Sequence, residues 1–202
     1  MKKIFLPILS IVILLLLAAC SAQDSLKEPV ADQAMQLLDT VIIAKAYGDH
    51  SKEALNLAFE RVKQIDKTMS RYNTESDIYK INHNAGKKAV TVSPDTYFVI
   101  ENALHYANKT NGAFNPLIGK LVDLWGIGTD HAKVPSAKEL DMVIPHIDYH
   151  QLELDKITSS VRLNSDNVSL DLGAIAKGYA ADEMGRILQE QGITSASLNL
   201  GG

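Results

Sequence analysis

The chain has 202 residues, 46% hydrophobic and 22% charged, which is enough for one large domain with a buried core and excludes wholesale disorder, collagen-like repeats and coiled coils. Twenty Lys and Arg residues stand against 24 Asp and Glu, which gives a formal net charge of -4, and no basic run is present. No nucleic-acid partner is therefore expected, because binding to a phosphate backbone needs a concentrated positive surface.

Residues 1–19 are predicted to be an export signal. Two lysines precede an apolar stretch of 16 residues that contains Pro7. A helix that crosses a bilayer needs about 20 apolar residues, so this stretch is too short to span. We expect it to be removed on export, with an uncleaved signal anchor as the alternative.

The residues around Cys20 predict a lipid anchor. The sequence Leu17-Ala18-Ala19-Cys20 resembles the bacterial lipobox, and Cys20 is the only cysteine of the chain. Two or three acyl chains hold a protein on a membrane far more firmly than one. We therefore expect an exported protein, anchored through Cys20 on the outward face of a bacterial membrane. The polar residues 20–33 are expected to form a flexible tether.

Strand-like and helix-like patterns alternate through residues 34–202, which we assign to one domain. The first half predicts a strand over 40–47, a helix from a cap at Ser51 to Met69, a short strand over 89–92, and a helix opened by Ser93 and Pro94 that ends at Gly112.

The second half begins with a capping-box pattern at Ser136 and Glu139, which predicts a short helix that Pro145 terminates. Three alternating segments, 151–155, 160–164 and 168–172, predict an antiparallel meander. A helix from about Ile175 to Gly192 and a strand over 195–200 follow. The expected fold class is α+β, a mixed or antiparallel sheet with flanking helices. Because two glycines directly after a strand usually start a turn, we expect the domain to be incomplete at its C-terminus.

The stretch 170–179 carries the strongest signal for chemistry. A strand that ends in Asp171 passes through small residues into a helix, and Lys177 lies in the first turn of that helix. A helix N-terminus with a nearby cation favours an anion such as phosphate. The spacing matches neither the P-loop nor the dinucleotide fingerprint. From the residues alone, tight packing of a strand on a helix remains the alternative.

Two other clusters are candidates for a ligand site. Residues 69–73, Met-Ser-Arg-Tyr-Asn, contain Tyr72, which can stack on a flat ring or pack in a core. Residues 112–128 hold the only Trp among several glycines and can equally form a packed loop. His146 and His150 lack a third ligand nearby, so no zinc site is expected.

Together and in this order, these clusters resemble the ApbE family, the FAD:protein FMN transferases. Leu38-Asp39-Thr40 is similar to the family's opening Met-Gly-Thr or Met-Asp-Thr. Later motifs of the family, M-S-x-Y-N, G-x-F-D-P, L-W-G-x-G, L-D-L-G-x-I-A-K-G-Y-A-x-D and N-L-G-G-N, resemble the stretches 69–82, 112–128, 170–182 and 199–202. The resemblance covers residues 34–202 and implies an ApbE/T-fold-like domain.

Members of this family bind FAD and Mg²⁺ and transfer FMN to a Thr or Ser hydroxyl of an acceptor protein, forming a phosphoester and releasing AMP. The resemblance implies that one group of residues binds the cofactor and that the Ala174 carbonyl is a Mg²⁺ ligand. The cofactor-binding residues would be Leu38, Tyr72, Ala113, Phe114, Asn115, Asp171 and Lys177.

The chain departs from the family pattern at Asn115, which stands where the family usually has Asp and lacks its charge. The general base and the remaining metal ligands are expected beyond Gly202, so the chain alone is expected to be inactive. Two other functions remain open: an FAD pyrophosphatase that releases free FMN and AMP, and a surface lipoprotein that binds flavin without turnover.

Overall fold

The computed structural model describes residues 30–201. The predicted export signal at 1–19, the lipidation site Cys20 and most of the tether lie outside the described residues. No helix within 30–201 is both long enough and apolar enough to cross a membrane.

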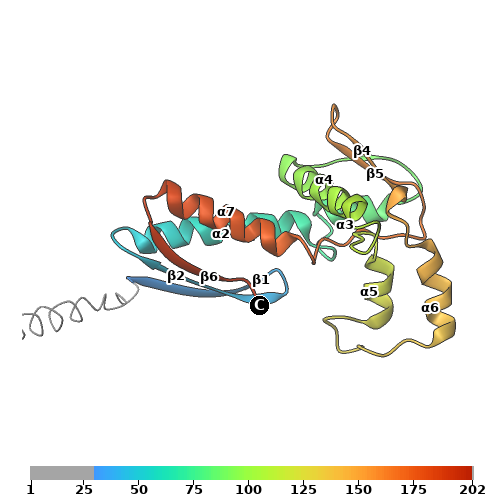
Figure 1. Ribbon diagram of the computed structural model, residues 1–202, viewed down its shortest axis with the longest axis horizontal. Helices are drawn as coiled ribbons and strands as arrows, with labels where there is room; N and C mark the ends of the chain where they lie inside the picture. Colours follow the sequence, from blue (N-terminus) through green and yellow to red (C-terminus); the bar gives the residue numbers. More distant parts are fainter. Residues whose placement is uncertain (1–29, 202) are drawn as a thin grey trace, which may run out of the picture.

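One half of the molecule is a three-stranded antiparallel sheet whose one face is covered by two long helices (Figure 1). Alternate residues of the middle strand, Ile42, Ala44 and Ala46, are completely buried under these helices, as the period-2 geometry of a strand requires. The sheet has the order β1-β2-β6, and its parts are β1 (Ala31–Leu37), β2 (Thr40–Tyr47), β6 (Ser195–Asn199), α2 (Ser51–Met69) and α7 (Ala176–Glu190).

The other half of the described part of the chain holds a small sheet of order β3-β5-β4 and the remaining helices (Figure 1). Mixed helices and antiparallel strands confirm the α+β class. The parts are α3 (Asp77–His83), β3 (Val90–Thr91), α4 (Pro94–Lys109), α5 (Gly119–Trp125), α6 (Ala137–Val143), two 3-10 turns (Ile144–His146 and Tyr149–Gln151), β4 (Leu152–Asp155) and β5 (Ser160–Leu163).

The sequence pattern does not predict strand β1. It begins at Ala31, so residues 31–33, which we assigned to the tether, pair with β2. The register from Ala31↔Ala46 to Leu37↔Thr40 half-buries every second residue of β1. The half-buried side of this strand includes Ala and Gln, so hydrophobicity differs little between its two sides. The strand is recognised from its hydrogen bonds to β2 and not from its sequence pattern.

The predicted helix caps are confirmed at two of three positions. The Ser93 hydroxyl accepts a hydrogen bond from the Thr96 amide, and Ser136 and Glu139 form the full capping box. The cap predicted at Ser51 is wrong. His50 precedes the helix in a left-handed conformation, and the Ser51 hydroxyl donates to the Gly48 carbonyl. The turn before α2 therefore uses this hydroxyl as a donor.

The third strand of the predicted meander is also wrong. β4 and β5 form the expected hairpin, but residues 168–172 leave that sheet. Their backbone instead lies against residues 116–119, since the Gly119 amide donates to the Ser169 carbonyl and the Asp171 amide donates to the Pro116 carbonyl, each at 2.8 Å. This path of residues 168–172 brings Asp171 to the junction of the two halves.

Gly119 permits this close approach. A Cβ at residue 119 would lie 2.6 Å from the Ser169 hydroxyl oxygen and 2.7 Å from the Ser169 carbonyl oxygen. We expect Gly119→Ala to lower the free energy of unfolding by about 1–3 kcal/mol, because a rigid backbone neighbour must move. Urea unfolding followed by circular dichroism measures this change.

Gly185→Ala is the matched control, because it places the same methyl group inside α7, where nothing beyond the neighbouring backbone of the helix lies within 4 Å. This change should raise the free energy of unfolding by about 0.5–1 kcal/mol through helix propensity. Equal effects of the two substitutions would contradict the steric account of Gly119.

Candidate functional site

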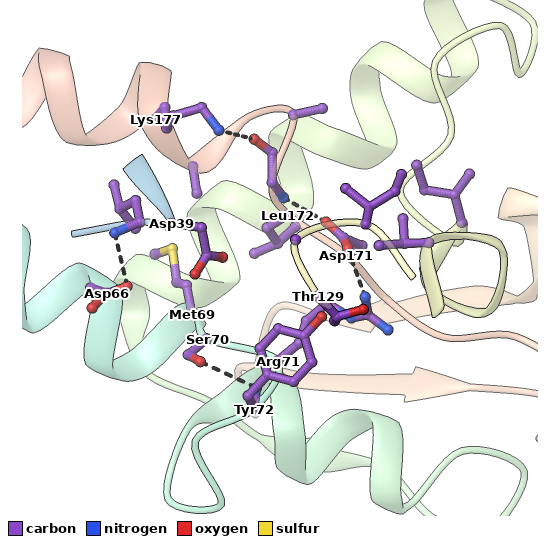
Figure 2. A pocket seen from close by; sticks show the side chains of 18 of the residues that line it. Asp39, Asp66, Met69, Ser70, Arg71, Tyr72, Thr129, Asp171, Leu172 and Lys177 are labelled. Atoms are coloured by element: carbon purple, nitrogen blue, oxygen red, sulfur yellow. Dashed lines mark hydrogen bonds and ion pairs between the residues drawn. The ribbon is translucent and has the colours of Figure 1, made fainter. Parts of the chain in front are cut away.

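A cleft of about 900 Å³ opens where the two halves meet (Figure 2). Its walls come from the β1–β2 turn, the end of α2, α5 with the loop after it, and the turn before α7. The lining residues are Gln36, Leu38, Asp39, Asp66, Met69, Ser70, Arg71, Tyr72, Ile118, Val122, Ile127, Gly128, Thr129, Asp171, Leu172, Gly173, Ala174, Ala176 and Lys177.

The β1–β2 turn forms an acidic corner of the cleft. Leu38 and Asp39 both have left-handed backbones, with φ of 52° and 57°. Two such residues make a tight hairpin turn, although this conformation is strained for leucine. The Leu38 amide donates to Asp66 Oδ1 at 3.2 Å. Burial, with a smaller contribution from the like charge of Asp39, raises the pKa of the Asp66 carboxyl above its ordinary value.

The turn before α7 exposes backbone polar groups to the cleft. Asp171 Oδ1 accepts the Gly173 amide at 2.7 Å, and Lys177 Nζ donates to the Gly173 carbonyl at 3.0 Å. No side chain caps the N-terminus of α7. Among the described residues, nothing donates to the exposed Ala174 carbonyl and the Gly178 amide has no acceptor. The turn thus offers both a free oxygen and a free helix N-terminus.

The end of α2 presents an aromatic ring to the cleft. The Ser70 hydroxyl accepts the amides of Tyr72 and Asn73, each at 3.2 Å, and so fixes the chain after the helix. The Tyr72 side chain is 61% exposed, which excludes the core-packing alternative. The Arg71 guanidinium carbon lies 5.7 Å from the centre of the Tyr72 ring. The ring is therefore available for stacking on a planar ligand.

Arg71 was not predicted as a site residue. Its Nη1 donates to Asp171 Oδ2 at 3.0 Å, and its Nη2 donates to both carboxylate oxygens of Asp123, at 3.0 and 2.9 Å. Nη2 also donates to the Gly119 carbonyl at 3.1 Å. The sequence places Arg71 in a polar cluster, but nothing in the pattern identifies partners so distant along the chain.

The structure brings five of the predicted residues to the cleft: Leu38, Tyr72, Asp171, Ala174 and Lys177. Ala113, Phe114 and Asn115 do not line it. Phe114 packs edge-on against Tyr106, and Asn115 Oδ1 accepts the Leu117 amide. The flavin contact predicted for these three residues stays a prediction. Asp39, Asp66, Arg71 and Thr129 line the cleft without having been predicted.

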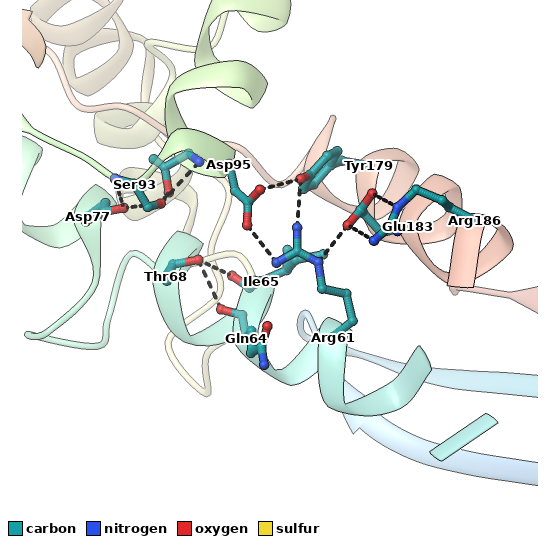
Figure 3. A network of polar contacts seen from close by, with 11 residues as sticks. Arg61, Gln64, Ile65, Thr68, Asp77, Ser93, Asp95, Tyr179, Glu183 and Arg186 are labelled. Atoms are coloured by element: carbon teal, nitrogen blue, oxygen red, sulfur yellow. Dashed lines mark hydrogen bonds and ion pairs between the residues drawn. The ribbon is translucent and has the colours of Figure 1, made fainter. Parts of the chain in front are cut away.

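A polar network anchors the helix that follows the cleft (Figure 3). Arg61 of α2 forms ion pairs of 2.7 Å with Asp95 of α4 and with Glu183 of α7. The Tyr179 hydroxyl donates to Asp95 at 2.8 Å and accepts from Arg61 at 3.0 Å. The hydrogen bond from Arg61 lowers the pKa of Asp95. Burial, then the bond to Asp95, raises the pKa of Tyr179 to about 12.

This network fixes α7 relative to the rest of the molecule, because Tyr179 and Glu183 lie in its first half and their partners belong to α2 and α4. Within residues 30–201, no cluster of three or more His, Cys, Asp or Glu side chains could hold a metal ion.

Comparison with known proteins gives consistent matches. The model of the ApbE family matches residues 38–202. An FAD:protein FMN transferase of Treponema pallidum is 36% identical over 154 residues, covering 74% of this chain and 42% of the relative. One of Klebsiella pneumoniae is 36% identical over 166 residues, covering 82% of this chain and 52% of the relative. The chain thus spans about half the length of these relatives.

Solved structures share the fold. The crystal structure of an ApbE protein from Thermotoga maritima superposes with a TM-score of 0.76 at 28% identity, covering 83% of this chain and 56% of that one. The flavin transferase ApbE from Vibrio cholerae gives a TM-score of 0.77 at 24% identity, covering 85% and 57%. At 24% identity, the similarity to the Vibrio cholerae structure supports the fold only.

Tyr179→Phe tests the network behind the cleft. The substitution removes one hydroxyl, so that Arg61 Nη2 and Asp95 Oδ1 each lose one hydrogen bond while the ion pair between Arg61 and Asp95 remains. We expect the free energy of unfolding to fall by about 1–2 kcal/mol at neutral pH, because hydrogen bonds to charged groups contribute that much in a partly exposed site. Chemical denaturation measures the change, and Tyr106→Phe, on the exposed face of α4, is the control.

The difference between wild type and Tyr179→Phe should also depend on pH. The native state keeps the phenol neutral until its raised pKa of about 12, whereas the unfolded chain ionises near the ordinary value of about 10. The stabilisation is therefore complete below pH 10 and is lost as the pH rises towards 12. A difference that stays constant over this range would contradict the assigned pKa.

Proposed function

The chain belongs to the ApbE family, and we propose that the protein transfers FMN from FAD to a Thr or Ser hydroxyl of an acceptor protein, with release of AMP. The observation that carries this proposal is the convergence of Tyr72, Lys177 and the exposed Ala174 carbonyl on one cleft at the N-terminus of α7. An aromatic ring, a cation and a helix terminus are what a flavin joined to a diphosphate requires.

Each group has a task in this proposal. The exposed Tyr72 ring stacks on the flavin, and the Leu38 side chain gives an apolar contact from the β1–β2 turn. The Lys177 ammonium and the Gly178 amide face the phosphate oxygens. Lys177 already donates to the Gly173 carbonyl, so its charge is held at the turn and needs little reordering when the ligand binds.

The proposed reaction is a phosphoryl transfer. The hydroxyl oxygen of the acceptor bonds to the phosphorus on the flavin side of FAD, and the bond from that phosphorus to the bridging oxygen breaks. AMP leaves with the bridging oxygen, and the hydroxyl loses its proton. Such transfers depend mainly on positioning and on stabilising the charge on the phosphate oxygens. Lys177 and the terminus of α7 contribute to that stabilisation.

Mg²⁺ is the metal proposed for this site, and one oxygen donor in the turn before α7 fits it. Magnesium prefers hard oxygen donors, and the Ala174 carbonyl is exposed and accepts no hydrogen bond from the described residues. The Asp171 carboxylate lies in the same turn. When bound, Mg²⁺ neutralises charge on phosphate oxygens. In this proposal Ala174 is one of its ligands.

The proposal is tested by incubating the full-length protein with FAD, Mg²⁺ and a candidate acceptor protein, and then weighing the acceptor by mass spectrometry. We expect the acceptor to gain the mass of one FMN phosphoester while AMP appears in equal amount. Free FMN and AMP with an unmodified acceptor would favour the pyrophosphatase. Bound FAD without any AMP would favour a flavin-binding lipoprotein.

Lys177→Met should weaken FAD binding about tenfold, as the loss of one charge-assisted contact worth about 1.4 kcal/mol implies. Quenching of FAD fluorescence measures the affinity. Lys109→Met removes an exposed lysine at the end of α4 that is not part of the cleft lining, and should leave the affinity unchanged. Equal affinities for the two variants would remove Lys177 from the proposed site.

We also propose that the protein is exported and anchored by lipid on Cys20. Cys20→Ser removes the only thiol of the chain and should move the protein from the membrane fraction to the soluble fraction of the cell envelope. Fractionation followed by immunoblotting measures this. Retention of the variant in the membrane fraction would point to an uncleaved signal anchor instead.

A further inference from the structure

Arg71 lies between the two sides of the cleft. We call residues 171–177 the turn wall, and α5 with residues 126–129 the helix wall. Nη1 of Arg71 binds Asp171 of the turn wall at 3.0 Å. Nη2 binds Asp123 at 2.9 Å and the Gly119 carbonyl at 3.1 Å, both in the helix wall. The planar guanidinium thus joins two segments that also flank the ligand-sized cleft.

The guanidinium leaves one donor unused in doing so. The Arg71 side chain is only 10% exposed, and its Nε is the one buried side-chain nitrogen or oxygen without a hydrogen-bond partner among the described residues. A buried donor without a partner costs stability. The contacts of Nη1 and Nη2 to the two walls therefore determine the position of Arg71, although Nε makes no hydrogen bond in this position.

We propose that Arg71 is a positioning residue that couples the two walls of the cleft and so sets the geometry that receives the ligand. Asp171 illustrates the consequence for the turn wall. Its Oδ2 is held by Arg71 and its Oδ1 accepts the Gly173 amide. Orienting this carboxylate orients the turn that exposes Ala174. Where the ligand is FAD, the inference rests on the proposed function.

The two contacts of Arg71 differ in strength. The Asp171 side chain is 14% exposed, whereas the Asp123 side chain is 52% exposed. Water and salt weaken an exposed ion pair far more than a buried one. Arg71 is therefore held firmly to the turn wall, and the helix wall is the side that gives way first when the coupling is weakened.

The Arg71→Lys substitution tests whether the two walls need the planar guanidinium or only its positive charge. Lysine keeps the positive charge and avoids burying an unpaired Nε, but a single ammonium lacks the planar fork that serves both walls. In Arg71→Lys we expect backbone amide exchange to accelerate about tenfold in both walls, measured by hydrogen exchange with mass spectrometry. In Asp123→Asn only the helix wall should accelerate. Arg162→Lys, at an exposed arginine of β5 that binds Asn164, is the matched control and should change neither.

The FAD arm of the experiment measures affinity by fluorescence quenching on the same proteins. We expect affinity to fall about tenfold in Arg71→Lys while the thermal unfolding midpoint stays within the range of the Arg162→Lys control. Rescue of binding by lysine, or acceleration of one wall alone in Arg71→Lys, would overturn the coupling.

If Arg71→Lys does not fold, Asp123→Asn decides alone, because acceleration of both walls or of neither contradicts the proposal. Wild type that fails to bind FAD would refute the proposed function, and the exchange data would still decide the coupling.

Discussion

The segment from Leu170 to Gly173 is held by three distant parts of the chain, and the cleft depends on how it is held. The Asn82 side chain donates to the Leu170 carbonyl at 2.9 Å and accepts its amide at 2.7 Å, as a neighbouring strand would. The Asp171 amide donates to Pro116 and its carboxylate binds Arg71. These bonds replace the sheet partner that the segment lacks, and they determine where α7 begins.

A second set of contacts, along the first half of α7, also fixes the position of this helix. Arg61, Asp95, Tyr179 and Glu183 connect it to α2 and α4 through mutually bonded, partly buried groups. A buried charge that loses one partner is costly, so each member of such a network constrains the others. The first turn of α7 is consequently held from the cleft side by the 170–173 segment and from the far side by this network.

Local sequence signals predict part of this arrangement but not the contacts between residues far apart in the sequence. Helices α2, α4 and α7 and the caps at Ser93 and Ser136 follow from spacing and from side chains within four residues of each other. Asp171 and Lys177 follow from a strand that runs into a helix. Arg71 does not, because its partners lie 48, 52 and 100 residues away in sequence. Residues 168–172 alternate between apolar and polar side chains in the sequence, but the structure buries Ser169 together with its apolar neighbours, because only the tertiary fold decides what a strand-like segment pairs with.

The charges that line the cleft come from separate segments of the chain and differ in sign. Arg71 and Asp171 compensate each other in an ion pair, so they add little net field. Asp39 remains in the β1–β2 turn and Asp66 beside it, where burial raises the pKa of the Asp66 carboxyl. Lys177 and the uncapped terminus of α7 remain at the turn before that helix. An anion is repelled by the carboxylates and attracted to Lys177 and the helix terminus, and Tyr72 lies beside Arg71 of the ion pair. A ligand with an aromatic ring and a diphosphate therefore has one favourable orientation, with the phosphates at α7 and the ring over Tyr72.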